Sequence, residues 1–413
     1  MVMSKKRLDQ AMNAIQQSRR KYKFDIQTWL SAAVTFNQAC KDALESHAPP
    51  RNSSLAQLYD KVDYISRLIS NSLALVIRIP DPAKRTGEWA TAGAGKLLQS
   101  KDIEADAVVS KDGTGDYGSI SEAIGAATGE RFVIYVKSGV YAENVIVHRD
   151  GIVLIGDGKN STVITGNRNV AAGASLSGSA TLSVTGDGFM ARDIGISNTA
   201  GPSAAQAVAL NIVSDHAVLY RCSITGYQDT LYAVALRQFY RECDISGTID
   251  FIFGNAAAVF QVCNLILRRP NYGASNVILA NGRTDPGQNT GFALQMCTIS
   301  VGPDLYPDKG SYRSYLGRPW KAFSRAVVME STIDAAVSPS GWLEWPDASA
   351  GTYSTLYFAE YANYGTGSGT SGRVKWPGFH VIRAAEAETF TVENFIDGES
   401  WLPPTGVAYY SGL

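Results

Sequence analysis

Five short segments in the second half of the chain share one pattern: RCSITG at 221–226, ECDISG at 242–247, VCNLIL at 262–267, MCTISV at 296–301 and MESTID at 329–334. Aligning Cys222, Cys243, Cys263, Cys297 and Glu330 gives steps of 21, 20, 34 and 33 residues. A step near 20 residues suits one coil of a parallel β-helix, and longer steps suit coils with inserted loops. A leucine-rich repeat would need regularly spaced leucines, and a propeller would need a period of about 40 residues or more. The repeat therefore predicts an all-β domain, a single-stranded right-handed parallel β-helix.

The sequence around the repeat, from Asp106 to the end, has the same texture. Short β-rich runs alternate with Gly, Asn and Asp, and they predict strands bounded by turns. The clearest runs are 131–136, 144–147, 152–155 and 162–164.

The first 79 residues have a different pattern. Apolar residues recur three and four positions apart over 55–69, and the spacing over 24–44 is close to helical. These stretches predict a small α-helical region, a hairpin or partial bundle. Segment 80–105 is rich in Gly and Pro and has little periodicity, so it predicts a linker.

Composition excludes several classes of protein. The 413 residues carry a net charge of -1, which gives no global electrostatic argument for nucleic acid or an anionic membrane as partner. No apolar run reaches the ~18 residues that a membrane span needs. Residues 1–19 are polar and lack the pattern of a secretory signal. Five cysteines without a CxxC pair, and only 4 histidines, give no pattern typical of a zinc site.

The candidate chemistry lies in two aspartates. Asp229 and Asp250 each stand seven residues after an aligned cysteine, Cys222 and Cys243. If the cysteines stack on successive coils about 4.8 Å apart, the aspartates stack as well. Two such carboxyl groups do not ionise independently, and one retains its proton to higher pH. One acid can then act as a nucleophile while its neighbour acts as general acid and base.

The surroundings of this pair favour catalysis, although Asp ladders can also be purely structural in β-helices. Tyr227, Tyr232 and Phe253 place aromatic rings beside the acids, where they desolvate a carboxyl group and offer a face to a sugar ring. Gln206, near one coil further back, and Gln228 could donate to a developing oxyanion. In LGRPW at 316–320, Arg318 could pair with an ionised aspartate, or the motif could be a surface turn.

The motifs that contain these residues resemble the plant-type pectin methylesterases, also called pectinesterases. The resemblance covers 106–413, and its motifs follow the order of the family: GVYAENV at 139–145, QAVAL at 206–210, GYQDTLY at 226–232, DFIFGNAA at 250–257, GRTDP at 282–286, LGRPW at 316–320 and FIDGESWLPPTGV at 395–407. It implies a catalytic β-helix that hydrolyses methyl esters of polygalacturonate, releasing methanol and pectate, with no metal or organic cofactor.

The resemblance also implies a role for each site residue. Asp250 would be the nucleophile that forms an aspartyl acyl-enzyme, and Asp229 the general acid and base. Gln206 and Gln228 would form the oxyanion hole, and Arg318 would orient Asp250. The substrate-binding residues are expected to be Trp320, Phe253, Tyr227 and Tyr232. Cys263 and Cys297 match positions that are bridged in some relatives, whereas Cys222 and Cys243 could form a bridge or remain buried thiols.

The helical region is similar to the inhibitor-like pro-domain of many of these enzymes, a disulfide-stapled four-helix bundle. The likeness lies in DIQTWLSAA at 25–33 and SNSLAL at 70–75. About three helices are expected here, without the cysteine that would pair with Cys40. Segment 94–100 resembles a processing site in which Lys96 is the only basic residue. The expected domains are therefore an inhibitor-like region at 1–79, a linker at 80–105 and a catalytic β-helix at 106–413.

The implied partners are homogalacturonan, the methyl-esterified form of pectin, and inhibitor proteins, and the implied place of action is the extracellular cell wall. Two alternatives stay open. A pectate lyase or polygalacturonase on the same fold would cut the polymer, but a lyase needs an acidic calcium site and a basic proton abstractor. A pectin-binding β-helix without activity, or an inactive relative, predicts the loss of a motif acid, whereas both Asp229 and Asp250 are present.

Overall fold

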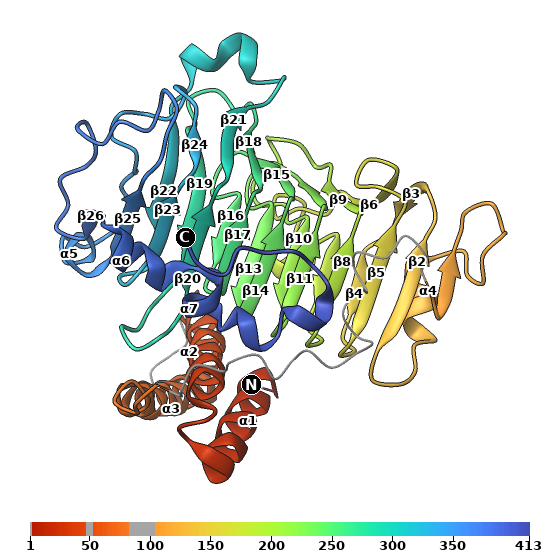
Figure 1. Cartoon of the computed structure of the whole chain (residues 1–413), viewed down its shortest axis with the longest axis horizontal. Helices are drawn as coiled ribbons and strands as arrows, with labels where there is room; N and C mark the ends of the chain where they lie inside the picture. Colours follow the sequence, from red (N-terminus) through yellow and green to blue (C-terminus); the bar gives the residue numbers. More distant parts are fainter. Residues whose placement is uncertain (1, 47–52, 82–103) are drawn as a thin grey trace.

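The computed structural model describes residues 2–46, 53–81 and 104–413, and its main body is a stack of parallel strands with three helices packed against one side (Figure 1). The strands form three sheets, and each typical coil contributes one strand to each sheet. Strands paired within a sheet come from successive coils, as when β10 pairs in parallel with β7 and β13. The prediction of a parallel β-helix preceded by a helical region is confirmed.

The three sheets are named A, B and C here. Sheet A contains β1 Ala107–Val109, β2 Phe132–Val136, β5 Ile152–Gly156, β8 Met190–Arg192, β11 Ala217–Tyr220, β14 Arg237–Arg241, β17 Ala257–Gln261, β20 Gly291–Gln295, β23 Arg325–Met329, β25 Tyr357–Tyr361 and β26 Phe379–Val381. Sheet B contains β3 Gly139–Ala142, β6 Thr162–Gly166, β9 Gly195–Asn198, β12 Ser223–Thr225, β15 Asp244–Gly247, β18 Asn264–Leu267, β21 Thr298–Val301 and β24 Thr332–Ile333. Sheet C contains β4 Val145–Val147, β7 Leu182–Val184, β10 Leu210–Val213, β13 Leu231–Ala235, β16 Ile252–Gly254, β19 Asn276–Asn281 and β22 Ser314–Pro319.

The interior of the β-helix is filled by stacked rows of apolar side chains. Ile196, Ile224 and Ile245 occupy one row on sheet B and are at most 1% exposed. Alternate residues of each strand point inward, so that one apolar side chain lies above another from coil to coil. Burying each such side chain contributes about 1.5–3 kcal/mol, which is why the repeat in the sequence translates into a continuous core.

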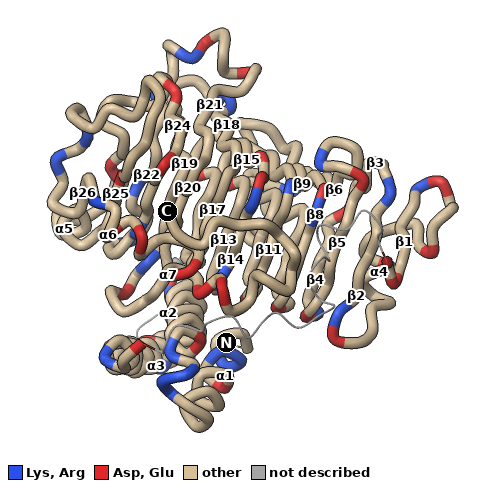
Figure 2. The backbone as a smooth tube through the Cα atoms, in the orientation of Figure 1, with Lys and Arg blue, Asp and Glu red and all other residues tan. Residues whose placement is uncertain are grey.

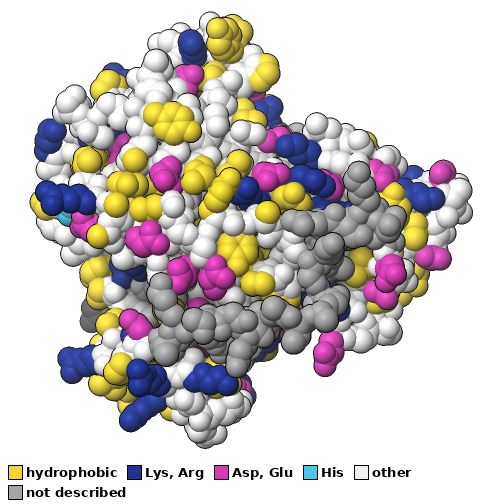
Figure 3. Space-filling model, in the orientation of Figure 1, with side chains coloured by type: hydrophobic (Ala, Val, Ile, Leu, Met, Phe, Trp, Pro, Cys, Tyr) yellow, Lys and Arg dark blue, Asp and Glu magenta, His cyan; other side chains and the backbone are white. Residues whose placement is uncertain are grey.

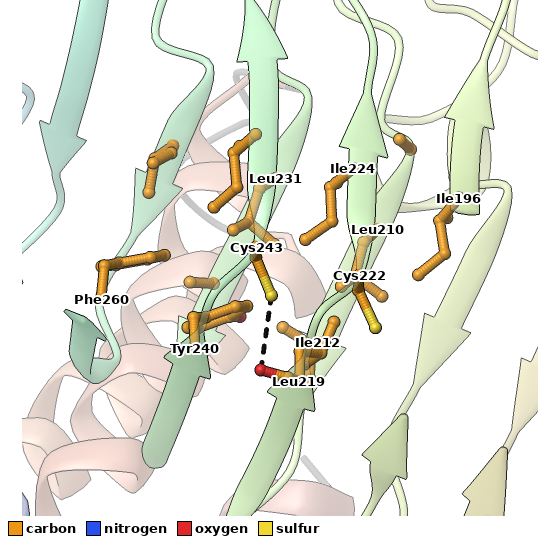
Figure 4. Packing of buried hydrophobic residues seen from close by; sticks show 14 of the residues in the cluster. Ile196, Leu210, Ile212, Leu219, Cys222, Ile224, Leu231, Tyr240, Cys243 and Phe260 are labelled. Atoms are coloured by element: carbon orange, nitrogen blue, oxygen red, sulfur yellow. Dashed lines mark hydrogen bonds between the residues drawn. The ribbon is translucent and has the colours of Figure 1, made fainter. Parts of the chain in front are cut away.

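The aligned cysteines form one of these rows, at the start of sheet B. Figure 4 shows two of them, Cys222 and Cys243. Three of the thiols donate a hydrogen bond to a backbone carbonyl of the preceding coil: Cys243 to Leu219 at 3.4 Å, Cys263 to Tyr240 at 3.5 Å and Cys297 to Phe260 at 3.2 Å.

All five cysteines, which lie in the described part of the chain, are free thiols. The predicted Cys263–Cys297 disulfide is therefore wrong for this structure, because the sulfur atoms are engaged with carbonyl groups in the core. Cys222 and Cys243 are also buried thiols, which was the second of the two arrangements considered for them.

The fifth aligned position needs a correction by one residue. Strands β21 and β24 pair Thr298 with Thr332, so Ser331, not Glu330, lies opposite Cys297. Its hydroxyl accepts a hydrogen bond from the Cys297 amide at 3.0 Å. Since side chains alternate between the two faces of a strand, the shift by one residue places Glu330 outside the interior row.

The outer face of sheet A is covered by the C-terminal segment, which crosses the strands in blue in Figure 1. This segment includes α6 Ala384–Ala387 and α7 Val392–Ile396. Its buried residues, among them Trp401 and Leu402, pack on the outward-facing residues of sheet A in a second apolar cluster. The smaller helices α4 Ile120–Gly125 and α5 Thr352–Thr355 lie near the two ends of the stack.

Three helices form the N-terminal region: α1 Val2–Ser18, α2 Lys23–Ser46 and α3 Ser54–Val76. The expected helical stretches 24–44 and 55–69 fall within α2 and α3. Helix α3 begins at an N-cap, Ser53, whose side chain accepts a hydrogen bond from the Ala56 amide at 3.2 Å. Most of the predicted linker, including Lys96, lies outside the described residues. Among the described residues, no helix combines the length and apolarity needed to cross a bilayer.

The helices dock on a row of acidic residues that we call the aspartate ladder: Asp150, Asp187 and Asp215. The Asp150 carboxylate accepts the amide of Asp187 at 2.7 Å, and the Asp187 carboxylate accepts the amide of Asp215 at 2.9 Å. Arg7 of α1 binds both oxygens of Asp187 at 2.8 Å, and Trp29 of α2 donates to Asp215 at 3.0 Å. Figure 2 shows acidic positions at the strand ends near these helices. The helical region is thus fixed to the β-helix by charge-assisted contacts.

Candidate active site

Asp229 and Asp250 occupy the same turn on neighbouring coils. Each stands two residues before a strand of sheet C, and those strands pair Leu231 with Ile252. The Asp229 amide donates to the Ile249 carbonyl at 3.0 Å, so the two turns are directly hydrogen-bonded. Since adjacent parallel strands are about 4.8 Å apart, the two carboxyl groups lie close enough to interact. The spacing from the cysteines therefore gave the correct register.

Both aspartates have a left-handed backbone conformation, with φ of 62° at Asp229 and 50° at Asp250. Asp adopts this conformation more readily than most residues other than Gly. Both residues are also buried, at 7% and 6% exposure. The repeated turn thus brings two acids to the surface of sheet C while it shields them from water.

Arg318 on β22 forms a two-point ion pair with Asp250. Its Nε donates to Oδ1 at 2.8 Å and its Nη2 donates to Oδ2 at 2.6 Å. This fork geometry fixes the orientation of a carboxylate as well as its charge. The pairing that the sequence suggested for Arg318 is therefore present, and Asp250 is the partner.

The two acids have different electrostatic environments. Burial and the negative charge of Asp250 raise the pKa of Asp229 well above its usual range, and Arg318 opposes this only in part. Burial also raises the pKa of Asp250, but its hydrogen bonds with Arg318 and the charge of the guanidinium act in the opposite direction. A proton shared by the pair consequently resides on Asp229, and Asp250 is the anion.

The two predicted glutamines come from the same turn on neighbouring coils. Gln228 directly precedes Asp229, and its carbonyl accepts the amide of Ala207 at 3.1 Å. Gln206 precedes Ala207, and its own carbonyl accepts the amide of Val170 at 2.9 Å. Both glutamines are partly exposed, and Gln228 stands in the same turn as Asp229.

Three aromatic residues form a wall next to the acids. Tyr232 and Phe253 are paired across β13 and β16, and their rings stack with centroids 4.2 Å apart. Phe253 also meets Trp320 edge-on, with centroids 6.1 Å apart. Gly282 makes room for the indole, because a Cβ atom there would lie 2.7 Å from its Cε3. Such faces suit the packing of sugar rings.

Tyr227 is the predicted substrate-binding residue that the structure does not bring into this wall. It lies two residues before Asp229, and its ring stacks against Arg268, with 3.9 Å between the guanidinium carbon and the ring centroid. The sequence pattern grouped Tyr227 with the other aromatics because it stands two residues before Asp229 in the segment 227–232.

Trp345 is a site residue that the sequence reasoning missed. The guanidinium of Arg318 lies over its ring at 4.4 Å, which is a cation–π contact. The loop that carries Trp345 is held beside β22 by an isolated bridge between Gly317 and Trp342. No local signal marks this proximity; only the cluster of tryptophans in GWLEW at 341–345 could have suggested it.

Elsewhere in the described ranges, 2–46, 53–81 and 104–413, a further hollow contrasts with this site. This hollow of about 580 Å³, lined by residues that include Lys159, Asp193, Arg221 and Glu242, lies at the turns before sheet B and contains none of the predicted site residues. Among the described residues, no group of three His, Cys, Asp or Glu is arranged to hold a metal ion. Acidic and basic side chains are interspersed on the face seen in Figure 3, in keeping with the net charge of -1.

The parallel β-helix carries a coupled pair of acids, an arginine that orients one of them and a wall of aromatic rings. Together these features define an enzyme that acts on carbohydrates with two carboxyl groups. Comparison with known proteins identifies the family. Residues 106–399 match the pectinesterase family, and residues 1–75 match the plant invertase/pectin methylesterase inhibitor family. The chain belongs to the pectinesterase family.

Similar proteins extend over almost the whole chain. A probable pectinesterase/pectinesterase inhibitor of Arabidopsis thaliana is 52% identical over 409 residues, which cover 97% of this chain and 74% of that protein. Pectinesterase 2 of Citrus sinensis is 48% identical and covers 95% of this chain and 76% of its own length. The solved structure of a pectin methylesterase from carrot matches with a TM-score of 0.74 and 48% identity, over 76% of this chain and 100% of that chain.

Proposed function

We propose that this chain hydrolyses the methyl esters of polygalacturonate, with Asp250 as nucleophile and Asp229 as general acid and base. The observation that carries the proposal is the unequal pair: Asp250 bound at two points by Arg318, and Asp229 buried beside it without that partner. Family membership and the names of the relatives, pectinesterases and a pectin methylesterase, support the choice of ester and polymer.

In the first half of the reaction, an oxygen of the Asp250 carboxylate attacks the ester carbonyl carbon. The resulting oxyanion accepts hydrogen bonds from the side-chain amides of Gln206 and Gln228. As the tetrahedral intermediate collapses, the bond to the methoxy oxygen breaks and Asp229 donates its proton to that oxygen. Methanol leaves, and the galacturonyl group remains joined to Asp250 as an anhydride.

In the second half, Asp229 is a carboxylate and takes a proton from a water molecule. The hydroxide that forms attacks the galacturonyl carbonyl, the anhydride bond to Asp250 breaks, and the galacturonic acid that is released gives its carboxyl proton to the solvent. Asp229 is again protonated and Asp250 is again anionic. Arg318 stabilises Asp250 both as attacking and as leaving carboxylate, and the wall of Tyr232, Phe253 and Trp320 would hold the sugar rings.

The test is the loss of methanol release in Asp250→Asn and Asp250→Ala. Removing a nucleophile lowers the rate by about a thousandfold or more. Asp244→Ala is the matched control, because Asp244 lies on sheet B of the same coil, where it pairs with Lys159. Methanol release that survives in folded Asp250 variants would overturn the nucleophile assignment. Unsaturated or new reducing ends, instead of methanol, would favour a lyase or a polygalacturonase.

The proposal extends to domains, partners and location. The helices end at Val76 and the first strand begins at Ala107, which supports an inhibitor-like region at 1–79 and a catalytic domain at 106–413. Homogalacturonan in the extracellular cell wall is the proposed substrate. Inhibitor proteins are proposed as further partners, since a region of that family is docked on the same chain. Titrating activity against a purified inhibitor of this helical family tests the last point.

A further inference from the structure

Arg268 connects the end of β18 to the turn that carries Gln228 and Asp229. Its Nη1 donates to the carbonyl of Gly226 at 3.0 Å, and its Nη2 donates to the hydroxyl of Tyr227 at 2.7 Å. The guanidinium also stacks on the Tyr227 ring at 3.9 Å. One planar group therefore holds both the backbone and the side chain of the residues that lead into the proposed acid.

Arg268 is itself fixed from behind. Its Nε pairs with Asp304 at 3.2 Å, and its amide donates to the carbonyl of Gly247 at 2.9 Å. Gly247 belongs to the intermediate coil and permits close packing, since a Cβ atom there would lie 2.7 Å from the Tyr227 carbonyl oxygen. The arrangement runs from a loop beyond β21, through Arg268, to the turn of the active site.

The turn is hydrogen-bonded on its other carbonyls as well. The Tyr227 carbonyl accepts the amide of Thr248 at 2.9 Å and the hydroxyl of Thr230 at 3.1 Å. The Gln228 carbonyl accepts the amide of Ala207 at 3.1 Å. Arg268 supplies the corresponding bond at the Gly226 carbonyl, so its removal would leave the first residue of the turn held only by its amide, which donates to the Ser246 carbonyl at 3.1 Å. The last residue of that turn, Asp229, has a left-handed backbone.

We propose that Arg268 is a positioning residue that holds Gln228 and Asp229 in their reacting geometry by clamping Tyr227 and Gly226. This inference rests on the proposed function of Asp229 and Gln228. The side-chain contacts of Arg268 are with Gly226, Tyr227 and Asp304, so it acts on Asp229 through the geometry of the turn. A displacement of a catalytic group by about 1 Å can lower a rate by about a hundredfold. Because the two groups act on the transition state, the loss falls on kcat and not on KM.

The test compares Arg268→Ala with Arg269→Ala in the full chain. Arg269 is the matched control, since it is the next residue, also an arginine, and it pairs with Asp308 at the surface without touching the turn. We expect kcat of Arg268→Ala to fall by roughly 10- to 100-fold with KM within about twofold, and Arg269→Ala to behave like the unmodified chain. The pH of half-maximal activity of Arg268→Ala should stay unchanged, because the substitution leaves Asp250 and Arg318, the charged groups that act on Asp229, in place.

Guanidinium at concentrations far below denaturing ones provides a second measurement. It can refill the slot between Tyr227 and Asp304, so it should restore part of kcat in Arg268→Ala, whereas methylammonium, which cannot stack or bridge in this way, should not. Unchanged kcat in folded Arg268→Ala would overturn the inference. A rise in KM with unchanged kcat would also overturn it, because it would assign Arg268 to direct binding of substrate carboxylates. Asp250→Ala is measured in parallel. Activity retained in Asp250→Ala would mean that the proposed function has failed, whereas activity lost in Asp250→Ala but unchanged in Arg268→Ala would mean that only the inference about Arg268 has failed.

Discussion

The helical region and the β-helix bury their apolar residues to different extents. In the β-helix, interior side chains such as Phe260 and Ile245 are 0% exposed, and each coil covers the next. In the helical region, α2 lies between α1 and α3, and large apolar residues remain at the surface, among them Met12 at 58%, Tyr64 at 61% and Leu75 at 65%. The helices thus form an open layer, and the β-helix forms a closed core.

The difference indicates that the two regions depend on each other unequally. The helices are held by the aspartate ladder and by polar contacts such as that between Ser70 and Asp285 at 2.5 Å. The β-helix has its own core. The match to the carrot enzyme covers 76% of this chain and the whole of the carrot chain. We therefore expect the β-helix to remain folded when the helices separate, and the helices to lose order without the β-helix.

The largest effect is expected from two matched core substitutions, Phe260→Ala and Leu73→Ala, both at residues that are 0% exposed. Phe260 stacks on Tyr240 with centroids 4.5 Å apart, and its loss should cost about 3–5 kcal/mol of unfolding free energy in the β-helix. Leu73→Ala should weaken only the helices, because Leu73 belongs to their apolar cluster. Hydrogen exchange along the chain, combined with denaturant unfolding, distinguishes the two regions.

If Leu73→Ala lowered protection throughout sheets A, B and C, the comparison would fail, since the two regions would then unfold as one unit. Ser72→Ala on the same helix is the control, because its hydroxyl bonds only to the carbonyl of Leu68 and it should leave both regions unchanged.

An intermediate effect is expected from pH at the junction of the two regions. His216 stacks on Trp401 and lies beside the ion pair of Asp215 and Arg237. Burial, and secondarily the charge of Arg237, lowers the pKa of His216 to about 4, whereas the charges of Asp215, Asp25 and Asp187 act in the opposite direction. The unfolded chain therefore binds this proton more readily, and the stability that His216 contributes should fall by roughly 3 kcal/mol as the pH drops from about 6.5 to 4, whereas the raised pKa values of Asp229 and Asp250 act in the opposite direction.

The pH effect is measured by denaturant unfolding at several pH values. His216→Phe keeps a ring against Trp401 and should flatten the dependence, whereas His148→Gln, at an exposed histidine, should not. The pKa of Asp187 is lowered from its ordinary value of 3.8, so its contribution is lost only below this window. An equal slope in His216→Phe and the unmodified chain would show that another group carries the pH dependence.

Much of the fold and of the acid pair could be predicted from the sequence because the coils repeat. Cys222 and Cys243 come directly before equivalent strands, so a constant offset of seven residues placed Asp229 and Asp250 in register. Regular strands of period two preserve such offsets over several coils. The offset would have been lost if a loop had entered between the cysteine and the aspartate in only one coil.

The predictions from the sequence were wrong or incomplete where the repeat is interrupted, and where a residue reaches the site from outside the repeated segments. MESTID contains no cysteine to fix the alignment, and Glu330 was placed one residue away from the true equivalent, Ser331. Trp345 and Arg268 reach the site from loops and strand ends, where offsets carry no information. The disulfide came from resemblance alone, and the thiols of Cys263 and Cys297 are instead bonded to carbonyl groups.

The smallest effect is expected where the helices come nearest to the aromatic wall. Asp42 of α2 pairs with Lys321 at 3.0 Å, and the same ammonium lies 5.7 Å from the ring centroid of Trp320. The two side chains are 39% and 28% exposed, so water and salt screen the pair, and Asp42→Asn should weaken docking of α2 by less than about 1 kcal/mol. Hydrogen exchange in α2 at low and high salt measures this change.

Asp9→Asn is the control for that variant, since Asp9 pairs with Lys5 within α1 and does not touch the β-helix. Arg7, unlike Asp42, is shielded from water: it is 1% exposed and bound to Asp187. The aspartate ladder, and not the contact between Asp42 and Lys321, should therefore hold the helices in place. A coupling energy between Asp42 and Lys321 above about 2 kcal/mol in a double-mutant cycle would contradict this order. The helical region would then be fixed at the active site itself, and its release would have to begin there.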